Sequence, residues 1–367
     1  MRFLMLNWRD PKNPLSGGAE RVTLAYLKGL AQRGHEVYWF AYDFPGAARE
    51  EVFEGIHLVR GGGKGTSILA AKAWCRRQKK FDLVIDQHHG LAWFAPWWAK
   101  TNCVAYIHEV LGPIWNSFYT WPLNGIGRRQ ERWTQWLYRQ VPFWTPSEST
   151  RKTLQAHGVR TVKVFPNGVD TRPLEILEPK KIESPLRLIT VSRLAPNKRI
   201  DHAIRIVKAL QQRNVAARLT IVGGGDSENE LKQLAAETGL AASVEFAGKL
   251  AEPEKNRRLQ QAHFLLHTSV REGWGLNVIE ANAMGTPAIV YPVDGLVDST
   301  VHGETGIVTA YETPEAAADA LVEILKSPEK YERLRLNAWQ RSKTFGWNAV
   351  LPPVCDWLEQ QAAKPSK

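Results

Sequence analysis

Apolar residues along this chain of 367 residues follow two alternating patterns. Short continuous runs, such as residues 2–7 and 81–86, are bounded by turn-forming residues and predict buried strands. Between such runs, apolar residues recur at helical spacing, as they do from Val22 to Leu30. The alternation begins again at residues 186–191. The sequence therefore predicts an α/β protein with two domains, each built on its own series of strands and helices.

The boundary between these domains is predicted from a loss of periodicity. Residues 170–184 are rich in Pro, Glu and Lys and show neither pattern, as expected for a linker. We therefore assign residues 1–172 to a first domain and residues 184–345 to a second. A further amphipathic stretch around residues 350–358 follows the second domain.

One stretch of the second domain combines two carboxylates with a glycine turn. Glu272 precedes Gly273-Trp274-Gly275, and Glu280 lies in the helical pattern that follows. A helix beginning near Gly275 would direct unpaired backbone N–H groups and a positive dipole end at a ligand, which suits a phosphate. The two carboxylates can accept hydrogen bonds from hydroxyl groups. The stretch predicts a sugar nucleotide as ligand; the alternative is a strand–turn–helix with two solvated glutamates.

Three further candidate residues of the second domain follow predicted strands. Arg193 and Lys198 come directly after one strand, and Gly223 opens a triple-glycine turn after the next. In open α/β sheets the carboxyl ends of the strands line the ligand crevice, so the two cations could neutralise a diphosphate leaving group. A solvated basic loop explains them equally well. The spacing of the glycines does not match the dinucleotide fingerprint.

In the first domain, the candidates are a glycine pair and a histidine. Gly17 and Gly18 open the first helix, where backbone N–H groups could receive a phosphate or a sugar; an ordinary helix cap is the alternative. His108 directly follows a predicted strand, so it is a better candidate than His88 or His89, which have no third metal ligand at a recognisable spacing. A hydrogen-bonded structural histidine is the alternative for His108.

The net charge of +11 implies attraction to anions: nucleic acid, an acidic membrane surface or phosphorylated substrates. No apolar run is long enough to span a bilayer, and the N-terminus becomes polar too soon for a signal peptide. The three cysteines are scattered, which favours a reducing cytoplasm over a disulfide framework. The sequence therefore predicts a cytoplasmic protein.

Tryptophan is unevenly distributed, because eleven of the fifteen tryptophans lie before residue 150. Residues 128–139 form a basic helical pattern that carries Trp133 and Trp136. Such a helix could rest on an anionic bilayer, at the inner face of the membrane. Alternatively, it packs its aromatic residues into the core and leaves a solvated basic face.

Taken in order, these motifs resemble those of the retaining glycosyltransferases of family 4, which have the GT-B fold. The resemblance covers about residues 2–358. It implies two Rossmann-like domains facing a central cleft. It also implies that residues 346–367 pack back on the first domain, beginning at Phe345-x-Trp347. The donor implied is a nucleotide-diphosphate sugar, with UDP or GDP as the nucleotide, and no cofactor is required.

The resemblance also implies roles for individual residues of the second domain. In that family, the residue that matches Glu280 holds the nucleotide ribose, and the one that matches Glu272 contacts the donor sugar. The backbone that matches Gly273–Leu276 faces the sugar and the phosphates. Arg193 and Lys198 are similar to the basic pair that grips the diphosphate.

In the first domain, Gly17 and Gly18 resemble the glycine loop that closes over the donor, and His108 resembles the strand-end histidine near the transferred sugar. This chain departs from the family pattern at two positions. Trp274 replaces the commoner Phe, which should be tolerated because the backbone makes the contact. Asn277 is polar where Val is frequent, so its side chain could touch the phosphates or pack elsewhere.

The catalytic set predicted is His108, Arg193, Lys198 and Glu272. The donor-binding set predicted is Gly17, Gly18, Gly223, Gly273, Trp274, Gly275, Leu276, Asn277 and Glu280. No Asp-x-Asp motif occurs, so we expect no metal at the site and assign the stabilisation of the leaving diphosphate to the cations and the helix start.

Together with these residues, the resemblance implies a metal-independent, retaining glycosyltransferase, for which we expect a lipid-linked or polysaccharide acceptor. The alternatives within enzymes are a transferase for a small soluble acceptor and a nucleotide-sugar epimerase of the GT-B fold. The alternative outside enzymes is a basic protein that binds anions or nucleic acid. No nucleic-acid partner is expected, because no known recognition pattern occurs.

Overall fold

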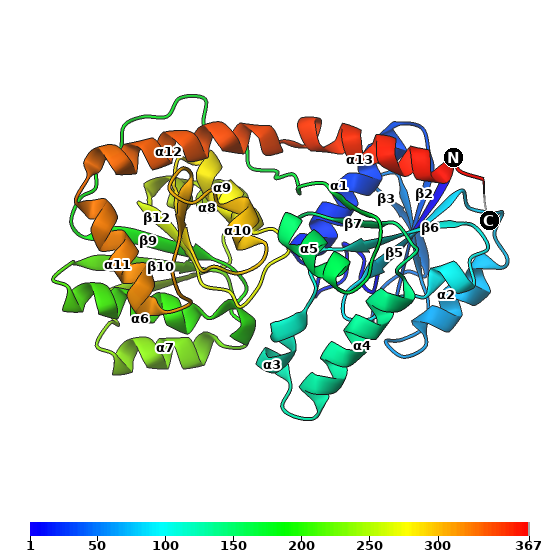
Figure 1. Ribbon diagram of the computed structural model, residues 1–367, viewed down its shortest axis with the longest axis horizontal. Coiled ribbons are helices and arrows are strands. Elements are labelled where there is room, and N and C mark those ends of the chain that lie inside the picture. Colours follow the sequence, from blue (N-terminus) through cyan, green and yellow to red (C-terminus); the bar gives the residue numbers. More distant parts are fainter. Residues whose placement is uncertain (366–367) are drawn as a thin grey trace. The chain divides into compact units, whose positions relative to one another are not determined.

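The computed structural model describes residues 1–365, which divide into two compact units (Figure 1). Unit 1 comprises residues 1–112, residues 125–168 and the chain from Trp347 onward, and unit 2 comprises residues 113–124 and 169–346. Residues 113–124, which the sequence analysis assigned to the first domain, therefore group with unit 2.

Unit 1 is built on an eight-stranded sheet with the order β3-β4-β2-β1-β5-β6-β7-β8. Only the β3–β4 pair at its edge is antiparallel. Its strands are β1 (Arg2–Leu6), β2 (Glu36–Ala41), β3 (Glu50–Phe53), β4 (Ile56–Arg60), β5 (Leu83–His88), β6 (Asn102–Ile107), β7 (Phe143–Thr145) and β8 (Val162–Val164). The central strands β1 and β5 are almost wholly buried, which explains their continuous apolar runs.

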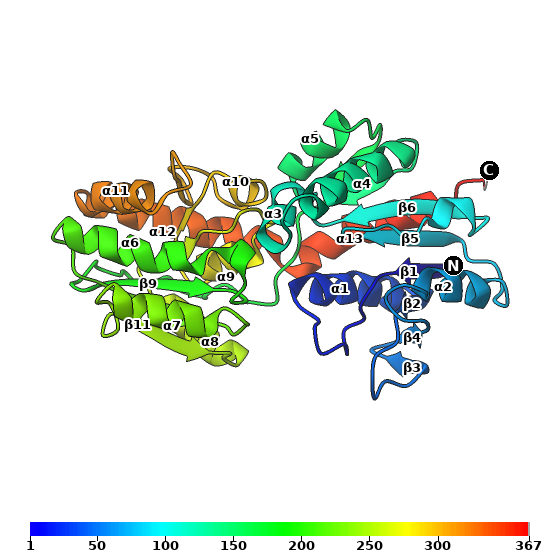
Figure 2. The same cartoon turned by 90° about the horizontal axis from the view of Figure 1, so that it is seen from below.

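The helices of unit 1 are α1 (Gly18–Gln32), α2 (Ser67–Cys75), α4 (Leu123–Leu137, in this unit from Gly125), α5 (Glu148–Ala156) and α13 (Trp347–Ala362), with a 3₁₀ turn at Ala95–Trp97. The C-terminal helix α13 lies beside α1 in both ribbon views (Figures 1 and 2). A Cβ atom at Gly29 of α1 would lie 3.2 Å from the Sγ of Cys355. The absence of a side chain at this glycine therefore allows the close approach of the two helices.

Unit 2 is built on a six-stranded, wholly parallel sheet with the order β11-β10-β9-β12-β13-β14. Its strands are β9 (Leu186–Val191), β10 (Ala217–Val222), β11 (Val244–Gly248), β12 (Phe264–His267), β13 (Ala288–Val290) and β14 (Gly306–Val308). Its helices are α3 (Trp115–Phe118), α6 (Ile200–Gln212), α7 (Glu228–Glu237), α8 (Glu252–Gln261), α9 (Leu276–Ala283), α10 (Leu296–Ser299), α11 (Pro314–Leu325) and α12 (Pro328–Ser342). The 3₁₀ turns are η2 (Gly112–Ile114), which begins in unit 1, η3 (Pro196–Lys198) and η4 (Lys343–Phe345).

The predicted fold class is confirmed: two parallel-sheet units of α/β type, with the C-terminal helix in the first unit. Some strand boundaries were wrong by one or two residues. The predicted strand at residues 2–7 ends at Leu6. The strand predicted at residues 81–86 runs from Leu83 to His88, and its last two residues are polar but buried in the sheet. Within residues 1–365, no helix has both the length and the apolar character needed to cross a bilayer.

Candidate active site

The structure brings two predicted catalytic residues of unit 2 together at the carboxyl ends of β9 and β12. Glu272 lies in the turn between β12 and α9, and its carboxylate forms an ion pair with Lys198 of η3. The same oxygen, Oε1, accepts a hydrogen bond of 2.8 Å from the Ser269 hydroxyl. His267 Nε2 lies 3.5 Å from it. One carboxylate oxygen is therefore surrounded by three polar side chains.

The electrostatic balance of this cluster favours an ionised carboxylate. Burial by itself would raise the pKa of Glu272, but the charges of Lys198 and His267 and the hydrogen bonds from Lys198 and Ser269 bring it below its ordinary value. Burial lowers the pKa of His267 to about 4. At neutral pH, the carboxylate of Glu272 is therefore ionised and the imidazole of His267 is neutral.

The backbone around the cluster is fixed by Arg199, which follows Lys198. Its guanidinium group donates hydrogen bonds of 2.7 Å to the carbonyl groups of Thr268 and Ser269. In addition, the N–H group of Val270 donates to the carbonyl of Asn197 at 2.9 Å. These bonds join the loop after β9 to the loop after β12, so they hold the ion pair in place from both sides.

Two predicted glycines permit close backbone approach at these strand ends. Gly275 is the N-cap of α9 and has a φ of +80°, a left-handed conformation that favours glycine. Gly223 has a φ of +136°, and a Cβ atom there would lie 1.8 Å from the carbonyl oxygen of Ser192. The eight-residue helix α9 thus begins at Leu276, four positions after Glu272, with Gly275 as its N-cap.

The two positions that depart from the family pattern both have partners within unit 2. The indole of Trp274 is buried and packs on Phe345, with ring centroids 5.5 Å apart. Only its backbone is therefore left to contact a donor. Asn277 Nδ2 donates a hydrogen bond of 2.7 Å to the carbonyl of Val191. Its side chain thus ties α9 to the end of β9, one of the two outcomes that the sequence left open.

The second predicted carboxylate, Glu280, lies inside α9 and is only 4% exposed. Its Oε2 forms an ion pair of 2.9 Å with Nζ of Lys255, from α8. The remaining predicted cation, Arg193, is exposed and forms no side-chain hydrogen bond or ion pair with any residue of the described chain. The structure therefore pairs Lys198 with Glu272 but does not bring Arg193 into contact with either.

The predicted residues of unit 1 have partners of their own. Gly17 is the N-cap of α1, and its N–H group donates 2.7 Å to the carboxylate of Glu20 rather than facing solvent; Gly18 is the first residue of the helix. His108 follows β6 as predicted, and its Nδ1 lies 3.3 Å from the hydroxyl of Tyr106. Burial, together with the charge of His89, lowers the pKa of His108 to about 3, so its ring is neutral.

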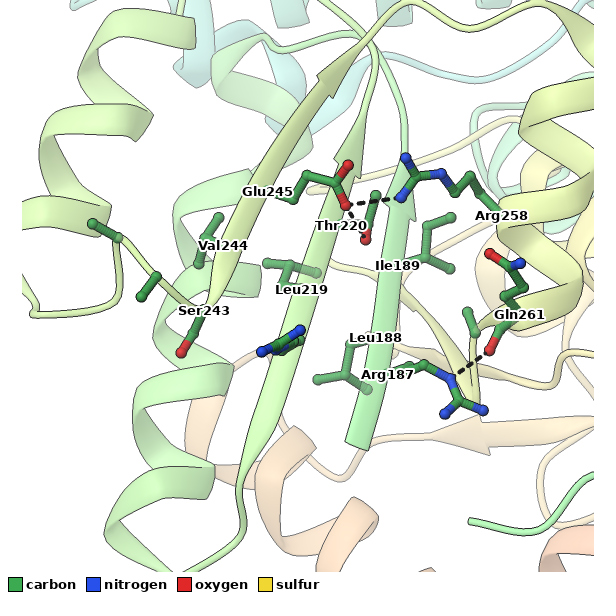
Figure 3. Close-up of a pocket in the computed structure, with 14 residues that line it drawn as sticks. Arg187, Leu188, Ile189, Leu219, Thr220, Ser243, Val244, Glu245, Arg258 and Gln261 are labelled. Atoms are coloured by element: carbon green, nitrogen blue, oxygen red, sulfur yellow. Dashed lines mark hydrogen bonds and ion pairs between the residues drawn. The ribbon is translucent and has the colours of Figure 1, made fainter. Parts of the chain in front are cut away.

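A different part of unit 2 contains a hollow of about 440 Å³, shown in Figure 3. It lies at the amino ends of β9, β10 and β11, the opposite ends from Lys198 and Glu272. Arg258 of α8 donates 2.9 Å to Glu245, which also accepts from Thr220 at 3.1 Å. None of the predicted site residues lines this hollow, and its charged groups are largely paired with one another.

Sequence reasoning missed several residues that shape the site: Arg199, Lys255, His267 and Ser269. Of these, His267 and Ser269 offered the clearest signal, because His267 ends the strand that leads into the Glu272 motif and Ser269 lies two residues beyond it. Lys255 offered none, since it lies in a strongly charged helical stretch. Within the described chain, no group of three His, Cys, Asp or Glu residues could hold a metal ion.

Two family models match the chain, one on each side of the linker. Residues 16–172 match "Glycosyltransferase Family 4", and residues 174–341 match "Glycosyl transferases group 1". Glycogen synthase of Mycobacterium tuberculosis is 23% identical over 383 residues, which cover 95% of this chain and 92% of that protein. A GDP-mannose-dependent alpha-(1-6)-phosphatidylinositol monomannoside mannosyltransferase of the same species is 30% identical over 54% of this chain and 56% of its own length.

Solved structures show the same fold. Sucrose-phosphate synthase from Thermosynechococcus elongatus has a TM-score of 0.79 at 18% identity, covering 98% of both chains. Anabaena HepE in complex with UDP and glucose has a TM-score of 0.74 at 18% identity, covering 98% of this chain and all of that one. At these identities the likeness establishes the architecture alone.

Proposed function

Because the chain belongs to the family-4 glycosyltransferases, we propose that it moves a sugar from a nucleotide-diphosphate sugar to a glycan acceptor, with retention at the anomeric carbon. The observation that carries this proposal is the partly buried ion pair of Lys198 and Glu272, just before the N-terminus of α9. It places a fixed cation, a carboxylate and a helix N-terminus on neighbouring segments of one unit, as a diphosphate linked to a sugar requires.

In this mechanism, the bond between the anomeric carbon and the diphosphate oxygen breaks as the acceptor oxygen bonds to the same face of that carbon. The acceptor's proton passes to the departing phosphate oxygen, so no protein nucleophile is needed. Lys198 and the N–H groups of α9 stabilise the charge that develops on the diphosphate, with Arg193 as a further cation. These groups take the part that a metal ion would otherwise play. Glu272 orients Lys198 and accepts a hydroxyl hydrogen of the sugar.

The nucleotide is UDP or GDP, and the first test is to measure both. We expect one of the two to raise the melting temperature of the wild-type protein by mass action, and Glu280→Ala to lose that response. HepE binds UDP and the mannosyltransferase relative uses GDP-mannose, so each nucleotide has support. If neither nucleotide stabilises the protein at millimolar concentration, the donor-site proposal is wrong.

We further propose that the acceptor is presented at a membrane surface. The reason is that α4 turns polar side chains toward the core and large apolar side chains toward solvent. Its inward face is polar: the buried carboxylate of Glu131 accepts hydrogen bonds from the N–H groups of Leu111 (2.7 Å) and Gly112 (3.0 Å). Its outward face carries large apolar side chains, with Trp133 53% exposed and Trp136 51% exposed. The helix therefore does not pack these tryptophans into the core.

The outward face of α4 also carries three exposed arginines, Arg128, Arg129 and Arg132, which line an open hollow of about 450 Å³ together with Gly125. Half-exposed indole rings among cations match the interface of an anionic bilayer, where rings enter the headgroup region and cations meet lipid phosphates. A lipid-linked acceptor at such a surface agrees with the phosphatidylinositol acceptor in the relative's name. A relative named for D-inositol 3-phosphate favours a soluble acceptor instead. Binding of the protein to lipid vesicles distinguishes a lipid-linked acceptor from a soluble one.

A further inference from the structure

Lys255 is a buried lysine that has no role in the mechanism proposed above. It lies on α8 and is only 7% exposed. Its Nζ forms two contacts of 2.9 Å, one with Oε2 of the buried Glu280 and one with the half-exposed carboxylate of Glu252, one turn earlier on the same helix. A lysine is almost never buried unless its charge is paired, so the position of this ammonium group is set by its two carboxylates.

The pair matters because Glu280 is itself nearly inaccessible. A carboxylate without a nearby cation would be costly to ionise at such a position, and it would take up a proton instead. A protonated carboxyl group donates one hydrogen bond and loses part of its capacity to accept. With the ammonium group of Lys255 on Oε2, the side chain of Glu280 stays ionised and its orientation within α9 is fixed.

We propose that Lys255 is a positioning residue for nucleotide binding: it holds Glu280 as a fixed, ionised acceptor for the hydroxyl groups of the donor's ribose. This rests on the proposed function, which assigns the ribose to Glu280. Two adjacent ribose hydroxyls donate hydrogen bonds, and a carboxylate is the acceptor that binds them most strongly. Lys255 thus acts through Glu280, and its contribution should appear only with ligands that carry those hydroxyls.

The test measures the dissociation constants of UDP and GDP, each alongside its 2′,3′-dideoxy counterpart, by calorimetry. For the nucleotide that binds, wild-type protein should prefer the ribose form. Lys255→Met should weaken binding of that form by about 30-fold, the order expected for a charge-assisted hydrogen bond, and should leave the dideoxy form within about threefold. Lys255→Arg should restore most of the preference.

A double-mutant cycle tests whether the loss of ribose binding in Lys255→Met is transmitted through Glu280. If Lys255 acts through Glu280, then Lys255→Met combined with Glu280→Gln should bind no more weakly than Glu280→Gln alone. Lys232→Met removes an exposed lysine that is paired with Glu228 on the surface of α7, and this matched control should leave both dissociation constants unchanged. Glu252→Gln is a milder variant that keeps the buried pair, and it should reduce the ribose preference by about threefold.

The proposal is overturned if Lys255→Met and Glu252→Gln both keep the wild-type ribose preference. It is equally overturned if Lys255→Met weakens the ribose and dideoxy forms to the same extent, because that is the signature of a general structural role. Wild-type protein that binds neither nucleotide would instead refute the proposed function, and with it the ribose role of Glu280. The two failures are therefore distinguishable from the wild-type titration alone.

Discussion

Two helices of this protein, α9 in unit 2 and α4 in unit 1, differ in which side chains they bury: α9 buries apolar residues, and α4 buries polar ones. In α9 the apolar residues face the core, and the one buried charge, Glu280, is paired with Lys255. In α4 the buried face is polar, and its large apolar side chains, including Trp133 and Trp136, are half exposed. One helix pairs its buried charge within its own unit, and the other presents large apolar side chains on its exposed face.

The difference indicates where each helix finds its partner. At the N-terminus of α9, the left-handed Gly275 and the partly buried pair of Lys198 and Glu272 support the nucleotide-sugar donor that we propose. The surroundings of α4 are complete on the inside, through the backbone bonds of Glu131, and incomplete on the outside. The proposed function assigns an extended anionic surface as the partner of this outward face.

The largest expected effect comes from replacing Lys198 or Glu272, the ion pair that lies just before α9. Lys198→Met and Glu272→Gln should each lower turnover by about 10²–10³-fold, because each removes charge stabilisation or orientation at the departing diphosphate. Turnover is measured as sugar transfer with the donor identified by the nucleotide panel. Lys326→Met, which breaks an exposed ion pair with Glu323, is the control and should keep normal activity. Near-normal turnover in either site variant would remove the basis of the mechanism.

The second prediction concerns the close packing of the strand ends. Gly223→Ala should destabilise the protein by about 3 kcal/mol, because its Cβ atom would overlap the carbonyl of Ser192. Gly224→Ala is the matched control: its Cβ atom would meet only the Lys249 side chain, at 3.6 Å, and the change should stay within about 0.5 kcal/mol. Urea unfolding measures both. Equal stability of the two variants would show that the turn can relax, contrary to our argument.

These two helices also show what the sequence could predict. The start of α9 was found correctly because Gly-x-Gly after an apolar strand is a local signal, and the helix begins at Leu276 with Gly275 as its N-cap, near the expected position. The pairing of Lys198 with Glu272 was not predictable, since the two residues are 74 positions apart and meet only when β9 and β12 pair in the sheet. Lys255 was missed because a lysine in a charged helical stretch ordinarily faces solvent.

For α4, the sequence left two orientations open and could not choose between them. The pattern of residues 128–139 contains both aromatic and charged positions, and a core normally selects the aromatic ones. Here the core accepts Glu131 because the N–H groups of Leu111 and Gly112 need an acceptor. That requirement arises from a loop 19 to 20 residues earlier, which no helical periodicity reveals.

The third prediction tests the apolar part of the α4 surface. Replacing Trp133 and Trp136 together by serine should lower partition into anionic vesicles by about 30-fold, or about 2 kcal/mol, since each ring loses roughly half of a full burial. Stability in solution should not fall, because neither ring is in the core. Leu69→Ser, at an exposed leucine of α2, is the control. Unchanged partition of the double variant, measured by flotation, would exclude α4 as the docking surface.

The smallest expected effect tests the charged part of the same surface. Arg129→Gln should weaken binding to vesicles containing anionic lipid by about fivefold at low salt, because a cation near such a surface contributes about 1 kcal/mol. The effect should vanish in half-molar salt or on neutral vesicles, since it depends on unscreened charge. Arg76→Gln, which removes an exposed charge elsewhere in unit 1, should change binding less. A loss for Arg129→Gln that persists at high salt would mean that the arginine makes a specific contact, and α4 would then be a site for a defined partner rather than for a lipid surface.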